Sequence, residues 1–203
     1  GTFTRLLLPG FHRTVAEGSP ELPMLNRLFE IPYGASVRVE VEAHGTQELR
    51  LSDYGITHPV FPAQPPVSKS ADLASLPFVY DRSAYGHPSS RALAEVVELG
   101  TLRAVTLGRL EVSPFAYDPV AGTLRVHDRL TVRLHFAGSD PRAEAARKAA
   151  AHSPFFTGLY ERIDGYRGQH DLHPDQVRDV VTMAIVTPPA YEAQLADFVA
   201  WKR

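Results

Sequence analysis

The sequence contains no cysteine, which excludes disulfides, thiolate zinc sites and a cysteine nucleophile within these 203 residues. It also has no run of about 18 consecutive apolar residues, the length expected of a membrane-spanning helix. The formal net charge of −2 and the pI near 6.5 provide no sustained positive field. Nucleic acid and anionic membranes are therefore not expected partners. The N-terminal residues lack the layout of a signal peptide, although a signal that has already been removed would leave no trace.

A hydrophobic content of 44% is ample for a packed core. The nine histidines form no sequence pattern of nucleophile, base and orienting residue. Residues 170–175, His-Asp-Leu-His-Pro-Asp, offer imidazoles and carboxylates that suit a divalent metal. Their loop position without a fixed scaffold favours solvated polar side chains instead. We therefore predict neither a metal nor another cofactor.

Prolines are concentrated in one segment, from Tyr54 to Pro77. Because proline fixes φ and lacks a backbone donor, this segment is predicted to be an extended surface connection rather than a helix or a central strand. A connection of this length in a compact domain is usually functional or disordered. Its single cation is Lys69, and the neighbouring residues are Val67, Ser68, Ser70 and Ala71. Such small neighbours would let an extended backbone lie in another protein's cleft, like a substrate; the alternative is a solvated lysine in a flexible linker.

Alternating patterns predict an antiparallel β-sandwich over residues 1–138. Valines at 37, 39 and 41 alternate with charged residues, as in a half-buried strand, and residues 48–52 are expected to pair with it. Residues 24–31 are apolar enough to pack beneath that strand. Further strands are predicted at 2–8, 78–80, 93–99, 102–112 and 123–136. Residues 115–122 are expected to connect a hairpin, with Asp118-Pro119 starting the turn and Gly122 free to take positive φ.

The composition changes after residue 138, and residues 139–178 are predicted to be a helical or linker segment. Within it, 140–151 is an alanine-rich helix or linker and 155–166 a docking helix. Residues 180–186 are nearly continuous and β-branched, as in a strand buried on both faces, and 188–203 form an amphipathic helix. We interpret 179–203 as the first strand-helix unit of an α/β domain. One such pair cannot cover both faces of the strand, so the remainder must come from elsewhere.

Several short motifs, taken in order, resemble one known family. They are Thr2-Phe3-Thr4, Gly18-Ser-Pro-Glu-Leu-Pro23, Leu76-Pro-Phe-Val-Tyr80, Pro114-Phe-Ala-Tyr-Asp-Pro119 with Gly122-Thr-Leu-Arg-Val126, and Phe155-Phe-Thr-Gly158. Their order and spacing resemble the propeptide of the gingipain family of cysteine peptidases. Met183-Ala-Ile-Val-Thr and Asp197-Phe-Val-Ala-Trp-Lys202 are similar to the first strand and helix of that family's caspase-like catalytic domain.

The resemblance implies a zymogen of a secreted or cell-surface bacterial peptidase that cuts after lysine or arginine. The prodomain would chaperone and inhibit the cognate peptidase domain, covalently linked to it or as a cleaved complex. In this family a basic residue from an exposed loop enters the S1 pocket, and Lys69 is the matching position, with Val67, Ser68 and Ser70 beside it. A lysine there favours a lysine-accepting pocket, because a planar bidentate site would favour arginine.

Removal of such a prodomain requires a cut before Val180. The basic residues in this region are Arg162, Arg167 and Arg178, and we favour Arg167 because Arg167-Gly168 has the most exposed-looking composition. Ordinary surface arginines are the alternative, and Arg203 is a processing end or merely the limit of the sequence. By the same resemblance, the catalytic cysteine and histidine lie beyond this chain, so no catalytic residue is expected in it.

A second hypothesis is a carbohydrate-binding or adhesive β-sandwich module. Its stacking surface would come from Tyr54, Phe61, Tyr80 and Tyr85. Aromatic residues near loops more often pack in the core or along sheet edges. Limited proteolysis separates the hypotheses, because only the inhibitor hypothesis expects Lys69 to be protected when the peptidase is present.

Overall fold

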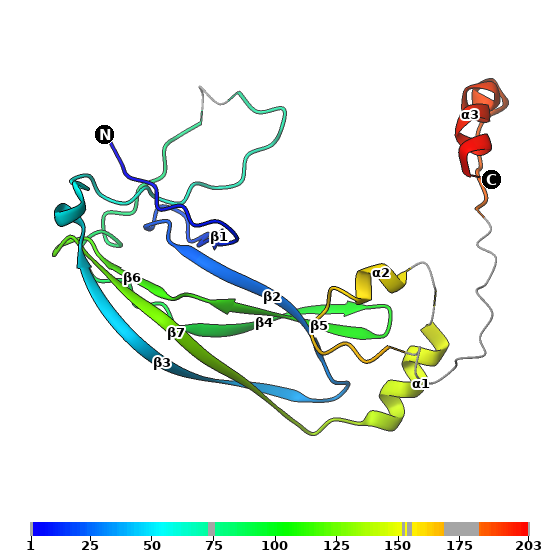
Figure 1. Ribbon diagram of the computed structural model, residues 1–203. Helices are drawn as coiled ribbons and strands as arrows, with labels where there is room; N and C mark the ends of the chain where they lie inside the picture. The colour runs from blue at the N-terminus through cyan, green and yellow to red at the C-terminus, as the bar shows by residue number, and fades with distance from the viewer. Residues whose placement is uncertain (1, 73–75, 152, 154–155, 169–182, 203) are drawn as a thin grey trace.

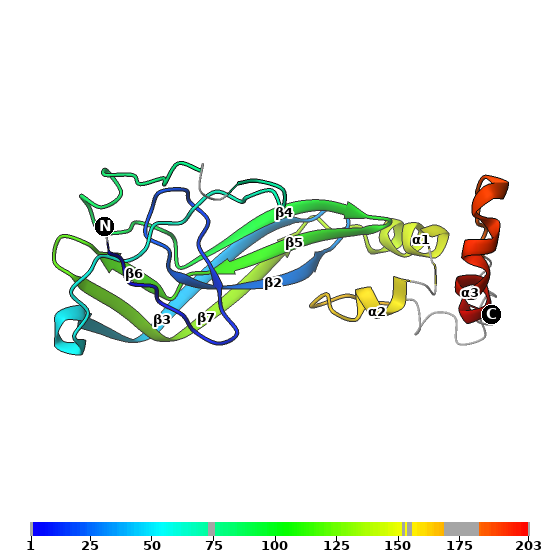
Figure 2. The same cartoon turned by 90° about the horizontal axis from the view of Figure 1, so that it is seen from above.

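Two antiparallel sheets face each other in the computed structural model, which describes residues 2–72, 76–151, 153, 156–168 and 183–202 (Figures 1 and 2). The first sheet has the order β1-β2-β5-β4, from His12–Arg13, Pro23–Ile31, Val105–Val112 and Ala94–Leu102. The second has the order β3-β7-β6, from Ser36–Arg50, Thr123–Ala137 and Phe115–Asp118. The predicted antiparallel β-sandwich is confirmed.

The longest strands, β3 and β7, pair over their whole length, from Ser36 opposite Ala137 to Arg50 opposite Thr123. The valines at 37, 39 and 41 are half-buried and the charged residues between them exposed, as their alternation predicts. The prediction that residues 48–52 pair with this strand is wrong, because Glu48–Arg50 continues it. No turn interrupts β3, since β7 is equally long and offers a partner to its far end.

The close approach of β2 and β5 depends on a glycine. Phe29 lies opposite Gly108 and is 5% exposed. A Cβ at Gly108 would come within 2.5 Å of the Phe29 Cζ atom, so only glycine leaves room for the ring. The ring also lies 6.1 Å from that of Phe136 on β7, which joins the two sheets.

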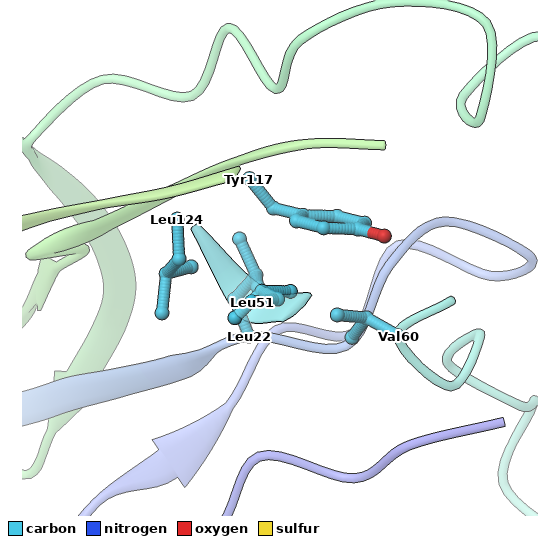
Figure 3. Packing of buried hydrophobic residues seen from close by; sticks show 5 residues of the cluster. All are labelled: Leu22, Leu51, Val60, Tyr117 and Leu124. Carbon is cyan, nitrogen blue, oxygen red and sulfur yellow. The ribbon is translucent and has the colours of Figure 1, made fainter. Parts of the chain in front are cut away.

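A cluster of buried apolar residues fills the sandwich at one end (Figure 3). Its members are Leu22, Leu51, Val60, Tyr117 and Leu124. Val60 belongs to the proline-rich segment, so the prediction of a surface connection is wrong for residues 60–63, of which Val60 is 0% and Ala63 3% exposed. Burial of Pro62 costs little free energy, because a proline has no N–H group that needs a partner.

Two short predicted strands are absent. Within 2–8 only Thr4 forms a bridge, opposite Val60: its N–H group donates to the Pro59 carbonyl and its carbonyl accepts from the Phe61 N–H group. The proline-rich partner has few donors, so the pairing goes no further. Residues 78–80 are not a strand, because the backbone of Val79 is paired by the side chain of Gln64 instead. The turn at 115–122 forms as predicted, with Asp118 accepting two backbone N–H groups and Gly122 at φ +63°, although Phe115–Asp118 is itself β6.

The C-terminal third agrees with prediction in part, since the helix expected over 140–151 forms. Helix α1 (Pro141–Ala151) follows β7 and packs through a buried Lys148. The docking helix expected over 155–166 is reduced to α2 (Thr157–Tyr160), because the backbone of Asp164 bonds to β2 instead. A second buried cluster there comprises Val105, Tyr160 and Ile163.

Near the C-terminus, a short 3₁₀ helix η5 (Pro189–Tyr191) leads into α3 (Glu192–Lys202), as predicted. The strand expected at 180–186 is not formed over the described residues 183–186, where Val186 is 99% exposed, because no described strand pairs with them. In both views α3 lies apart from the sandwich (Figures 1 and 2). No helix in the described residues is long and apolar enough to cross a membrane.

Candidate functional site

The predicted inhibitory residue lies on an exposed turn, which we call the basic loop (residues 67–71). Lys69 is exposed, as are Val67, Ser68 and Ser70. The turn closes through a hydrogen bond from the Ala71 N–H group to the Ser68 carbonyl, at 3.1 Å, and through contact of the two serine hydroxyls at 3.0 Å. The sequence predicts an extended backbone around Lys69, whereas the free chain presents this lysine at the tip of a turn.

The base of the same connection is held by one amide side chain. Gln64 donates to the carbonyl of Val79 at 2.8 Å and accepts from the N–H group of Val79 at 3.0 Å. On one side of this amide clamp, Ala63 exchanges backbone bonds with Gly18 and Ser19. The fold therefore anchors both ends of a segment whose tip stays in solvent. Sequence analysis missed Gln64, and its only signal was a polar residue among prolines.

Aromatic rings pack against one another beside the base of the connection. Phe3 lies 6.0 Å from Phe61 and 5.5 Å from Phe78, and Arg5 covers the Phe61 ring at 3.9 Å. Tyr80 and Tyr85 stack at 4.5 Å, and the Tyr85 hydroxyl donates to the carbonyl of Val60. Three of the four rings proposed for ligand stacking are thus engaged within the protein, and Tyr54 is 65% exposed.

A buried lysine organises the other end of the sandwich. The Lys148 ammonium lies 2.5 Å from Glu30 of β2 and 2.7 Å from Glu144 of α1, and it donates to the carbonyl of Arg167 at 3.2 Å. The Lys148 side chain is 6% exposed and that of Glu30 4%. Two carboxylates around one ammonium leave this group one negative charge in excess when all three are ionised. We call these three side chains the Lys148 cluster.

The pKa values of the two carboxylates in the cluster are shifted in opposite directions. Burial raises the pKa of Glu30 above its ordinary value, against the hydrogen bond and charge of Lys148. Burial also acts to raise the pKa of Glu144, but hydrogen bonds from Lys148 and from the Tyr33 N–H group outweigh it, so this pKa is lowered. As the pH falls, Glu30 is therefore expected to take up a proton before Glu144.

Arg167, the favoured processing residue, is hydrogen-bonded to this cluster through its backbone. The N–H group of Arg167 donates to Glu30 at 3.2 Å, and its carbonyl accepts from Lys148. The residue is exposed, as its composition suggests, but its backbone is held on both sides. Arg162 is also exposed, yet the next residue, Ile163, is 6% exposed. Arg178 and Arg203 lie outside the described residues.

The base of the connection that carries Lys69 and the Lys148 cluster lie at opposite ends of the sandwich. The connection that carries Lys69 leaves from η1 (Leu51–Tyr54), beyond the end of β3, whereas α1 follows the other end of the paired strand β7 (Figures 1 and 2). At about 3.3 Å per residue, strands of this length span about 50 Å. In neither view does the connection that carries Lys69 reach α1 or α2, the elements on either side of Arg167's anchoring cluster (Figures 1 and 2).

The described residues contain no group of three or more metal-ligating side chains that could hold an ion. The segment 170–175, considered above as a metal ligand set, lies outside them.

The fold defines a β-sandwich module whose proline-rich connection carries an exposed lysine on a turn. The Propeptide_C25 family model matches residues 1–155, and the chain belongs to this family. The predicted resemblance to gingipain propeptides is thereby confirmed.

Among curated proteins, Lys-gingipain of Porphyromonas gingivalis is 33% identical over 207 residues, which cover 100% of this chain and 12% of the relative. Gingipain R2 of the same organism is 24% identical over 193 residues, covering 92% of this chain and 25% of that protein. The chain thus spans about an eighth of the length of Lys-gingipain.

Two solved structures share the fold. One, described as a structural insight into zymogenic latency of gingipain K from Porphyromonas gingivalis, has a TM-score of 0.59 and 36% identity over 64% of this chain and 72% of that chain. The other is a complex of Porphyromonas gingivalis RgpB pro- and mature domains, with a TM-score of 0.53 and 19% identity over 70% of this chain and 75% of that chain. The second likeness concerns the fold alone.

Proposed function

We propose that this chain is the propeptide of a secreted or cell-surface gingipain-like cysteine peptidase, which it chaperones and keeps latent by placing Lys69 in the S1 pocket. The observation that carries the proposal is the exposed Lys69 at the tip of a connection whose base is clamped by Gln64. The name of Lys-gingipain, to which the whole chain aligns, supports a pocket that accepts lysine. The zymogenic latency described for gingipain K supports the inhibitory role.

The clamped base gives the loop a physical advantage as an inhibitor. Ordering a free segment on binding costs conformational entropy, and a base already anchored by the Val60 and Gln64 contacts reduces that cost. The turn at Ser68 and Ser70 is held by weak exposed bonds, so it can open into an extended cleft-bound form. The ammonium would need a carboxylate in the pocket, because an unpaired buried charge is too costly.

The rest of the chain fits a precursor with three parts. We assign residues 1–138 to the propeptide domain, 139–178 to a helical and processing segment, and 179–203 to the first strand-helix unit of the peptidase domain. Supporting this, Trp201 is 73% exposed and Val186 99% exposed, as expected of a unit whose packing partners lie outside this chain. A cut after Arg167 leaves residues 54–77 uncut, so the loop would stay in the pocket and the product would be a cleaved but bound complex.

The test is inhibition of the cognate peptidase domain by the 203-residue chain, assayed on lysine and arginine peptide substrates. Lys69→Ala is expected to weaken inhibition by about tenfold or more, because truncating one partner of a buried charge pair costs about 2 to 5 kcal/mol. Arg82→Ala is the matched control, since Arg82 is an exposed cation that lies outside the proline-rich connection, between Pro77 and β4. Equal inhibition by wild type and Lys69→Ala would exclude Lys69 as the S1 residue, and no inhibition by either would overturn the latency function.

A further inference from the structure

The four residues that precede the Arg167-Gly168 bond are folded onto β2. The N–H group of Asp164 donates to the Leu28 carbonyl at 2.9 Å, and the Asp164 carbonyl accepts from Glu30 at 3.0 Å. Its carboxylate receives two hydrogen bonds from Arg27, at 2.9 and 3.1 Å. Gly165 then turns the chain at φ +72°, and the Tyr166 N–H group donates to the carbonyl of Ile163.

This geometry differs from the one a peptidase acts on. Peptide segments bound in clefts are commonly extended and use their own backbone groups to bond the partner, as an added strand does. Here these groups are bonded within the chain, and a bent segment replaces an extended one. The Arg167 carbonyl, which the peptidase would have to polarise, accepts instead from Lys148.

Lys148 is suited to hold that carbonyl. Its side chain is 6% exposed, lies 5.1 Å from the Tyr166 ring and bonds carboxylates from both β2 and α1. Glu144 and Lys148 stand four residues apart on α1, so the helix orients the ammonium toward β2. Through its bond to the Lys148 ammonium, the Arg167 carbonyl is therefore linked to both β2 and α1.

We propose that the Lys148 cluster protects the Arg167-Gly168 bond and sets the rate at which this processing site opens. This inference rests on the proposed function, which makes Arg167 a processing residue. Cleavage then requires local opening, in which Arg167 leaves Glu30 and Lys148 while the sandwich stays folded. Lys148 acts as a positioning residue, not as part of any catalytic machinery.

The charges of the cluster predict an order of effects among variants. Lys148→Met keeps most of the side-chain length but removes the ammonium that lies between Glu30 and Glu144 and holds the Arg167 carbonyl, so the segment should open readily. Glu30→Gln removes the excess negative charge, keeps an oxygen for the Arg167 N–H group and leaves the Glu144–Lys148 pair intact. It also removes the ion pair between Glu30 and Lys148, so it should raise the rate of opening as well, but by less than Lys148→Met does.

Limited trypsin digestion of the 203-residue chain tests this, with mass spectrometry measuring how fast the fragment ending at Arg167 forms. The rate is divided by that of the cut after Lys69, an exposed bond in the same molecule. Lys148→Met is expected to raise this ratio by about tenfold or more. Lys202→Met removes an exposed lysine charge and should leave it unchanged.

An unchanged ratio in Lys148→Met and Glu30→Gln would overturn the proposal. If Lys148→Met unfolds the sandwich, early cuts at Arg133 within β7 would reveal it, and Glu30→Gln then decides: a raised ratio supports the proposal and an unchanged one refutes it. Because no peptidase inhibition is measured, the result does not depend on whether Lys69 fills an S1 pocket. Failure of this proposal is thus distinguishable from failure of the proposed function.

Discussion

Replacing Val60 by alanine tests whether the proline-rich connection is anchored in the core. The Val60 side chain is 0% exposed and packs with Leu22, Leu51, Tyr117 and Leu124 (Figure 3). Loss of two buried methyl groups costs about 1.6 kcal/mol, at about 0.8 kcal/mol for each buried carbon. The cavity left behind raises the cost in unfolding free energy to about 2 to 3 kcal/mol.

Val67→Ala is the matched control. It makes the same chemical change in the same connection, but Val67 is 43% exposed. Urea and thermal unfolding of both variants should show that Val60→Ala lowers the melting temperature by about 5 to 10 °C. Val67→Ala should change stability by no more than about 0.5 kcal/mol. Equal, small effects of the two variants would refute the conclusion that residues 60–63 belong to the core.

Two further predictions concern the sheets and the Lys148 cluster. Gly108→Ala should lower the free energy of unfolding, measured by chemical denaturation, by about 1 to 3 kcal/mol, because its Cβ would overlap the Phe29 ring. Adding Phe29→Leu to the same molecule should recover part of the loss. Full stability of Gly108→Ala would contradict this packing. In an NMR titration, Glu30 should take up its proton at higher pH than Glu144, because the pKa of Glu30 is raised and that of Glu144 is lowered. On acidification the contribution of Glu30 to stability therefore rises, whereas that of Glu144, present above its unfolded-state pKa, is lost. The reverse order of protonation would refute the opposite pKa shifts of these two carboxylates.

The β-sandwich could be predicted because its signals are local. Valines at 37, 39 and 41 alternate with charged residues, and the hairpin at Asp118 and Gly122 follows from turn chemistry. The extent of β3 could not be predicted, because it depends on the length of β7, whose paired residues lie 73 to 101 positions further along the chain (Arg50 with Thr123, Ser36 with Ala137). Long-range pairing leaves no mark in the sequence of one strand.

The candidate site, too, could be predicted only in part. Lys69 and its small neighbours are recognisable in the sequence, and the structure leaves them exposed. Neither the Gln64 clamp nor the bond between Lys148 and Glu30 could be predicted, because each joins residues far apart in the chain. Within this cluster, only the four-residue spacing of Glu144 and Lys148 on one predicted helix can be recognised in the sequence. An alanine-rich helix with exposed charges is the ordinary interpretation of that segment, and burial of its lysine depends on β2.

The central claim, that Lys69 enters the S1 pocket of the cognate peptidase, can be measured directly by lysine acetylation. The chain has three lysines: Lys69 and Lys202 are exposed, and Lys148 is buried. Acetylation rates are measured by mass spectrometry for the chain alone and with a peptidase domain inactivated at its catalytic cysteine. Entry into the pocket predicts that the domain slows acetylation of Lys69 by about tenfold or more, as expected for a desolvated, paired ammonium. If Lys69 is acetylated equally fast in the complex and in the free chain, this residue is not the one that confers latency.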